Sequence, residues 1–116
     1  MIQVSAKDFD RAVNRALDQV PDQFLALLEN VVVLVEDDPP EDEADLLGIY
    51  EGIPLTERDS HYGLVPPDRI TLYRNPLMSA SDSIEELIEE IGVTVVHEIG
   101  HYFGIDDDEL DELGWG

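Results

Sequence analysis

The sequence contains no cysteine, so disulfide bonds and thiolate metal sites are both excluded. Any metal ion must be held by histidine, by carboxylates or by main-chain oxygens. Histidine is itself scarce, with three in 116 residues. The candidate ligands of a metal site are therefore few.

Basic residues are also few, since 6 lysines and arginines stand against 28 acidic residues and the formal net charge is −22. Nucleic acids and anionic membranes bind first to lysine and arginine stripes, which this chain lacks, so we expect neither as a partner. A cationic partner would be attracted. We interpret the acidity first as a solubility or salt-adaptation trait.

Long apolar runs are absent, because the longest, Val31 to Val35, has five residues. A membrane-spanning helix needs about 20. The N-terminus has no apolar signal-peptide core, so we expect a cytoplasmic protein. The length and the apolar fraction of 43% suit one globular domain, which we place over residues 1–116.

Two helices are predicted near the N-terminus. Ser5 with Asp8 forms a potential capping box, and apolar residues then recur at helical spacing from Phe9 to Val20. Pro21 suits the first position of a second, short helix. The side chains that this short helix should turn inward are Phe24, Leu25, Leu27 and Leu28.

Three strands are predicted in the middle of the chain. The apolar, β-branched run Val31–Val35 predicts a central strand that is covered on both faces. Leu47–Tyr50 predicts a second strand, and the alternation in Arg69–Arg74 predicts a half-exposed strand at an edge. Between the first two, residues 36–45 hold seven acids and two prolines, which indicates a solvated loop.

A long helix is predicted from a second capping box, Ser83 with Glu86. Its apolar stripe runs from Ile84 to Val95 and keeps its phase across Gly92, which disfavours a helix by about 1 kcal/mol. Propensity alone would also allow a strand at 93–96. We prefer a helix that continues into residues 97–101.

The motif His97-Glu98-Ile99-Gly100-His101 places two imidazoles four residues apart, on one face of that helix. One divalent ion can reach both, and Glu98 beside them can take a proton from a metal-bound water. Zinc is the expected metal, although imidazole with carboxylate also suits iron, manganese and nickel. The alternative interpretation is two neighbouring surface histidines.

Catalytic zinc usually has a third protein ligand. Only 15 residues follow His101, so we expect this ligand from them or from upstream. Gly104 can end the helix at positive φ and turn the chain back. The spacing His-Glu-x-x-His-x-x-Gly-x-x-Asp selects Asp107, and the alternatives are Asp106, Asp108 and His61.

These residues resemble the small bacterial zincin-like metallopeptidases, and the resemblance covers about the last two-thirds of the chain. It rests on three segments: LGIYEGIPLTER (47–58), PDRITLYR (67–74) and HEIGHYFGIDDDELDELG near the C-terminus. The resemblance implies an α+β fold, with a small mixed sheet packed on an active-site helix. It also implies one Zn²⁺ per chain on His97, His101 and Asp107, with Glu98 as general base.

The implied function is hydrolysis of peptide or protein substrates. An aspartate ligand departs from the histidine of the related metzincins, and no methionine follows the motif to form their Met-turn. A carboxylate ligand cancels one unit of the zinc charge, so we expect weak or selective activity. The alternatives are a regulatory or non-catalytic protein that keeps the metal site, and an acidic interaction module whose motif is accidental.

Several tyrosines and arginines are expected to have structural rather than catalytic roles. The phenols of Tyr50, Tyr73 and Tyr102 are more often core residues than oxyanion donors. The basic residues Arg58, Arg69 and Arg74 are expected to pair with acids. An extended substrate could add to an edge at 69–74, where an ordinary edge strand is the commoner explanation, and a partner chain could complete the cleft.

Overall fold

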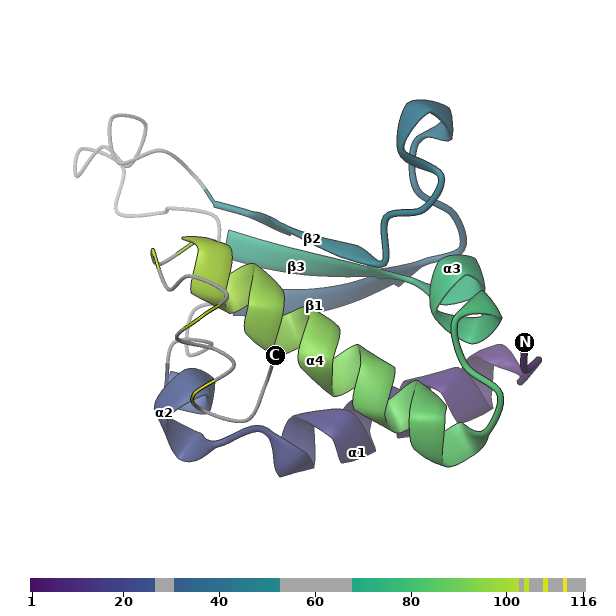
Figure 1. Ribbon diagram of the computed structural model, residues 1–116, viewed down its shortest axis with the longest axis horizontal. Helices are drawn as coiled ribbons and strands as arrows, with labels where there is room; N and C mark the ends of the chain where they lie inside the picture. The colour runs from purple at the N-terminus through teal and green to yellow at the C-terminus, as the bar shows by residue number, and fades with distance from the viewer. Residues whose placement is uncertain (27–30, 53–67, 103, 105–107, 109–111, 113–116) are drawn as a thin grey trace.

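The computed structural model describes residues 1–26, 31–52, 68–102, 104, 108 and 112. These residues form a mixed α+β fold with one three-stranded sheet. Figure 1 shows α1 and α4 on the same face of that sheet, with α3 at one end. The fold class expected from the sequence is confirmed, including the small mixed sheet and the N-terminal helices.

Helix α1 (Ala6–Gln19) begins where the capping box predicts, since the Ser5 hydroxyl accepts a hydrogen bond from the Asp8 N–H at 3.1 Å. It ends before Pro21, and the short helix α2 (Asp22–Leu25) follows. Phe24 is buried as predicted, whereas Leu27 and Leu28 lie outside the described residues. The side chains that α1 buries are Phe9, Ala12, Val13 and Ala16.

The sheet has the strand order β1-β3-β2. Strand β3 (Asp68–Tyr73) pairs in parallel with β1 (Val31–Glu36) and antiparallel with β2 (Gly48–Glu51). The register places Leu34 of β1 beside Thr71 and Ile49 of β2 on the other side of Thr71. These three residues therefore share one face, which we call the outer face because the helices cover the opposite one (Figure 1).

The predicted positions of two strands are wrong. In the described sheet β1 lies at an edge and β3 at the centre, whereas the sequence predicted the reverse. In β1 only Val31 and Val33 are partly covered, because a single face of this strand packs against the core. Arg69 is the exposed residue of β3. The other five residues of this strand are buried, because β3 has a neighbouring strand on each side.

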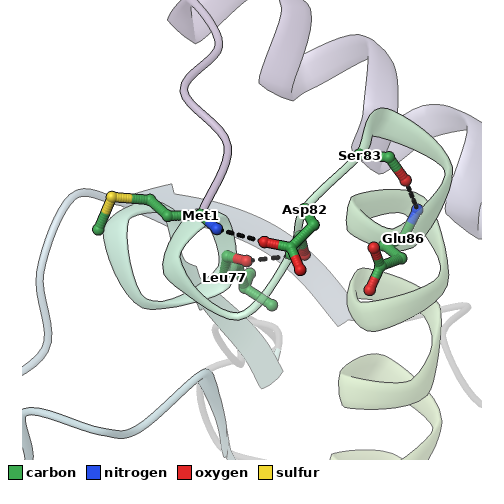
Figure 2. A network of polar contacts seen from close by, with 6 residues as sticks. Met1, Leu77, Asp82, Ser83 and Glu86 are labelled. Carbon is green, nitrogen blue, oxygen red and sulfur yellow. Dashed lines mark hydrogen bonds and ion pairs between the residues drawn. The ribbon is translucent and has the colours of Figure 1, made fainter.

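Helix α4 (Ile84–Tyr102) is continuous through Gly92, so the helical interpretation of residues 93–96 is confirmed. The Ser83 hydroxyl accepts a hydrogen bond from the Glu86 N–H at 3.1 Å and starts the helix (Figure 2). Its fully buried stripe packs against α1 and against the inner face of the sheet. That stripe consists of Leu87, Ile91, Val95, Val96 and Ile99.

Short segments complete the fold. Helix α3 (Arg74–Ser79) follows β3 directly and buries Leu77 and Met78; the sequence analysis did not predict it. The acidic segment is exposed at 41–45 and contains a 3₁₀ turn, η2 (Glu41–Glu43), which agrees with the expected solvated loop. Figure 2 shows the N-terminal amine of Met1 bonded to Asp82. No helix in the described segments is long and apolar enough to cross a membrane.

Candidate metal centre

The two motif histidines lie one turn apart near the end of α4, where this helix passes β2. The ring centroids of His97 and His101 are 6.0 Å apart, and the ring planes are inclined by 79°. His97 is partly buried, whereas the His101 side chain is 54% exposed. Ile99 between them is fully buried in the core, so the histidines emerge on the other side of the helix.

The Glu98 carboxylate lies between β2 and His101. Its Oε1 accepts a hydrogen bond from the main-chain N–H of Tyr50 at 3.2 Å, and its Oε2 is 3.8 Å from His101 Nδ1. The Glu98 side chain is only 23% exposed. One carboxylate oxygen is thus bound to the sheet, while the other faces the neighbouring histidine.

A glycine in β2 allows this close approach of helix and strand. A Cβ atom on Gly48 would lie 2.9 Å from the Thr71 carbonyl oxygen and 2.9 Å from the Thr94 methyl group. Thr94 is buried one turn before Glu98, and its hydroxyl donates to the Glu90 carbonyl at 2.7 Å. Because α4 is this close to β2, Glu98 can reach the main chain of Tyr50.

A second contact fixes Tyr50 in place. Its phenol donates a hydrogen bond at 2.8 Å to Oδ2 of Asp68, a carboxylate at the start of β3 that is only 9% exposed. The sequence analysis considered the Tyr50 phenol but missed Asp68 and the Tyr50 main chain. An aspartate after two prolines is an ordinary loop signal, so nothing in the local pattern indicated a buried acceptor.

Comparison with known proteins identifies the family of this chain. The sequence model of the zincin-like metallopeptidases matches residues 28–115, which is most of the chain. The chain belongs to the zincin-like metallopeptidase family. No curated protein gives a significant match. The matched region includes both β2 and the motif helix α4.

A solved structure shares the fold. It is a conserved hypothetical protein from a strain of T. thermophilus, with 24% sequence identity and a TM-score of 0.59. The match covers 86% of this chain and 94% of the other. At this level of identity the similarity concerns the fold alone.

The donor set of the zincin-like motif fits zinc. With zinc–nitrogen bonds of about 2.1 Å and tetrahedral angles, two imidazoles on one ion would have ring centroids about 5 Å apart. The centroids of His97 and His101 are 6.0 Å apart, which is close to this separation. The partly buried position of Glu98 beside them adds negative charge that favours a cation.

The third ligand stays a prediction. Asp107, Asp106 and His61 lie outside the described residues, and Asp108 is described only as exposed. Among the residues that the structure does describe, no three histidine or acidic side chains form a metal-binding group. Gly104 has a φ of 79°, as predicted for the residue that turns the chain after the helix.

Two of the three arginines in the family-like segments pair with acids, as expected. Arg69 contacts Glu51 at 3.3 Å on the outer face, and Arg74 contacts Asp37 at 3.0 Å. Arg58 lies outside the described residues. Both observed pairs lie at exposed carboxylates, so each contributes little stability by itself.

Proposed function

We propose that this protein is a zinc-dependent peptidase in which His97 and His101 hold the metal and Glu98 is the general base. The observation that carries the proposal is the position of the Glu98 carboxylate, which lies beside His101 and is bound to the N–H of Tyr50. Membership of the zincin-like family supports the same assignment.

The chemistry follows from the two carboxylate oxygens of Glu98. Zinc, when bound, supplies a Lewis acid that polarises a carbonyl group and makes water more acidic. Because Oε1 accepts the Tyr50 N–H, we assign proton transfer to Oε2. Glu98 takes the proton of the attacking water at Oε2 and delivers it to the amine that leaves. The Tyr50 hydrogen bond holds the carboxylate in position for both transfers.

We assign the third metal ligand to Asp107, from the spacing of the motif. An anionic ligand lowers the net charge of the centre, so catalysis depends more strongly on Glu98 than it would with three neutral imidazoles. We therefore expect slow or selective cleavage. The metal centre would still form if catalysis were lost, which is the basis of the regulatory alternative.

The peptide substrate should lie along β2. The predicted docking edge at 69–74 is wrong, because β3 lies between two other strands in the described sheet. Just before β2, the Leu47 carbonyl accepts a hydrogen bond from the main-chain N–H of Tyr73 in β3. Within β2, the Tyr50 N–H instead donates to Glu98. The edge of β2 that faces Glu98 therefore leads an extended chain past the general base. A partner chain that completes the cleft stays a prediction.

A peptide-library digest followed by mass spectrometry tests this function. The zinc-loaded protein should cleave a subset of peptides, and both a chelator and Glu98→Gln should abolish cleavage. Glu89→Gln is the matched control, since it makes the same change at an exposed position of α4 and should leave cleavage intact. Cleavage by a clean preparation of Glu98→Gln would refute the assignment. If no sample cleaves any peptide although zinc is bound, the regulatory or non-catalytic alternative is favoured.

A further inference from the structure

An apolar surface lies on β1, on the face of the sheet opposite the one that α4 covers (Figure 1). Among the described residues, the large hydrophobic side chains that are exposed are Met1, Val32, Leu34 and Val35. Three of these four belong to β1. Val32 and Leu34, each 41% exposed, share the outer face with Arg69 and Thr71 of β3. Figure 1 shows that α1 and α4 cover the other face of the sheet.

Strand β1 also lacks the usual protection of an edge strand. In the described sheet it has a neighbour on one side only. Edge strands are commonly protected from further pairing by lysine, proline or a bulge. This one contains none of these from Val31 to Val35, although 29% of all residues in the chain are charged. The charges begin at Glu36, the last residue of the strand.

Acidic residues lie along the outer face of the sheet and next to the end of β1. The Tyr73 phenol has a pKa raised above its usual value of 10.0, first by burial and then by the negative charges of Glu36, Glu51 and Glu43. Glu36 lies on β1 itself and Glu43 on η2, whereas Glu51 lies on β2, at the opposite edge of the sheet. Arg69 on this face is paired with Glu51.

An apolar strand in acidic surroundings favours a partner that is both apolar and positively charged. A second copy of this chain would bring another net charge of −22 and the same carboxylates to the contact, and like charges at an interface are strongly unfavourable. A basic segment would gain attraction from those acids as well as apolar burial. Apolar residues that alternate with lysine or arginine match the period of a strand.

We propose that β1 binds a basic polypeptide segment, which adds a strand at this edge of the sheet. Its apolar side chains cover Val32 and Leu34, and its lysines or arginines face Glu36, at the end of β1, and the neighbouring acids of the 36–45 segment. The main-chain hydrogen bonds of the added strand supply part of the affinity. This surface is separate from the motif helix, so the inference does not depend on peptidase activity.

Binding of a synthetic peptide to the full chain tests the inference. The probe is a peptide of about ten alternating lysine and valine residues, measured by fluorescence anisotropy and by amide shifts in NMR spectra. We expect saturable binding with shifts concentrated in β1. Peptides with glutamate in place of lysine, or serine in place of valine, should bind about tenfold more weakly or worse. Equal binding of the serine peptide would overturn the proposal, since it would show attraction by charge alone.

Two variants locate the surface. Leu34→Lys should weaken binding about tenfold or more by adding a like charge to the contact. Val32→Thr keeps strand propensity, removes apolar area and should weaken binding less. Asn14→Lys adds the same charge at an exposed position of α1 and serves as the matched control, with binding close to wild type. Equal losses in Leu34→Lys and Asn14→Lys would contradict the proposal. Circular dichroism shows that each variant is folded.

Two further results identify a different occupant and would also overturn the proposal. A dimer in sedimentation experiments that Leu34→Lys dissociates would show that a second copy covers β1. Slow exchange of all β1 amides in the free protein, with no shift on adding peptide, would show that the chain itself covers this edge. Binding that persists in Glu98→Gln would confirm that the surface acts independently of the metal centre.

Discussion

The main-chain N–H of Tyr50 donates a hydrogen bond at 3.2 Å to Oε1 of Glu98, across 48 positions of the sequence. This bond connects the motif helix α4 to strand β2. A general base works only when its carboxylate is held within reach of the proton that it receives. In this protein the main chain of a strand binds the Glu98 carboxylate, which suits the general-base role that we propose.

Gly48 should be intolerant of any side chain. In Gly48→Ala the new Cβ would meet the Thr71 carbonyl oxygen and the Thr94 methyl group, so β2 must move away from α4. We expect a loss of about 1 to 3 kcal/mol in the free energy of unfolding, together with a weaker Tyr50–Glu98 hydrogen bond. Urea denaturation measures the first effect, and the NMR shift of the Tyr50 amide proton measures the second.

The control for this variant is Thr94→Ser, which removes the methyl group and keeps the hydroxyl that donates to Glu90. The double variant should recover part of the stability that Gly48→Ala loses. Recovery should be incomplete, because the Thr71 carbonyl oxygen belongs to the main chain and stays in place. Wild-type stability of Gly48→Ala alone would show that the close approach of helix and strand is unimportant.

Tyr50→Phe should lower the stability of the protein. The substitution removes the phenol that donates at 2.8 Å to the Asp68 carboxylate, which is nearly buried. Loss of a hydrogen bond to a charged, buried acceptor costs about 1.5 to 3 kcal/mol. Chemical denaturation monitored by circular dichroism measures the change. An unchanged free energy of unfolding would mean that the Tyr50–Asp68 bond is not part of the support of β2.

Stability should fall at high pH because of Tyr73. Burial, followed by the charges of Glu36, Glu51 and Glu43, raises the pKa of this phenol above 10.0 in the folded protein. The folded state therefore holds the proton more tightly than the unfolded state. The resulting stability is fully present below the unfolded pKa and is lost as pH rises through the folded pKa.

Spectrophotometric titration of tyrosinate, compared with Tyr73→Phe, measures this effect. The difference between wild type and variant should show one phenol that ionises later than an exposed tyrosine. In parallel, the unfolding free energy of wild type should decrease more steeply above pH 10.0 than that of Tyr73→Phe. A phenol at Tyr73 that titrates like free tyrosine would contradict the placement of the three carboxylates around it.

Local patterns predicted much of the scaffold. The caps at Ser5 and Ser83 and the apolar stripes that follow them located the starts of α1 and α4 correctly, because capping and helical spacing depend on residues three or four apart. The helical phase also predicted continuity across Gly92. These signals concern neighbouring residues, and so a single sequence contains them.

The order of the strands was not predictable in this way. The sequence placed Val31–Val35 at the centre because the run is apolar, and it placed Arg69–Arg74 at an edge because polar residues alternate there. Exposed apolar residues are common on proteins, so composition does not determine how many neighbours a strand has. In the described sheet Thr71 is buried at the centre, whereas Leu34 is exposed at the edge.

The candidate site was predicted in part. The motif spacing identified His97, Glu98 and His101, which α4 does bring to one region. The main-chain donor at Tyr50 and the carboxylate of Asp68 were missed, because a backbone N–H looks the same at every residue and a loop aspartate usually faces solvent. The role of Asp107 stays a prediction.

The central claim is that His97 and His101 hold a zinc ion. Zinc content after exhaustive dialysis, measured by inductively coupled plasma mass spectrometry, tests it most directly. We predict one zinc ion per chain in wild type and in Glu98→Gln, and almost none in His97→Ala or His101→Ala. Full zinc content in both histidine variants would contradict the account, because the motif helix would then hold no metal.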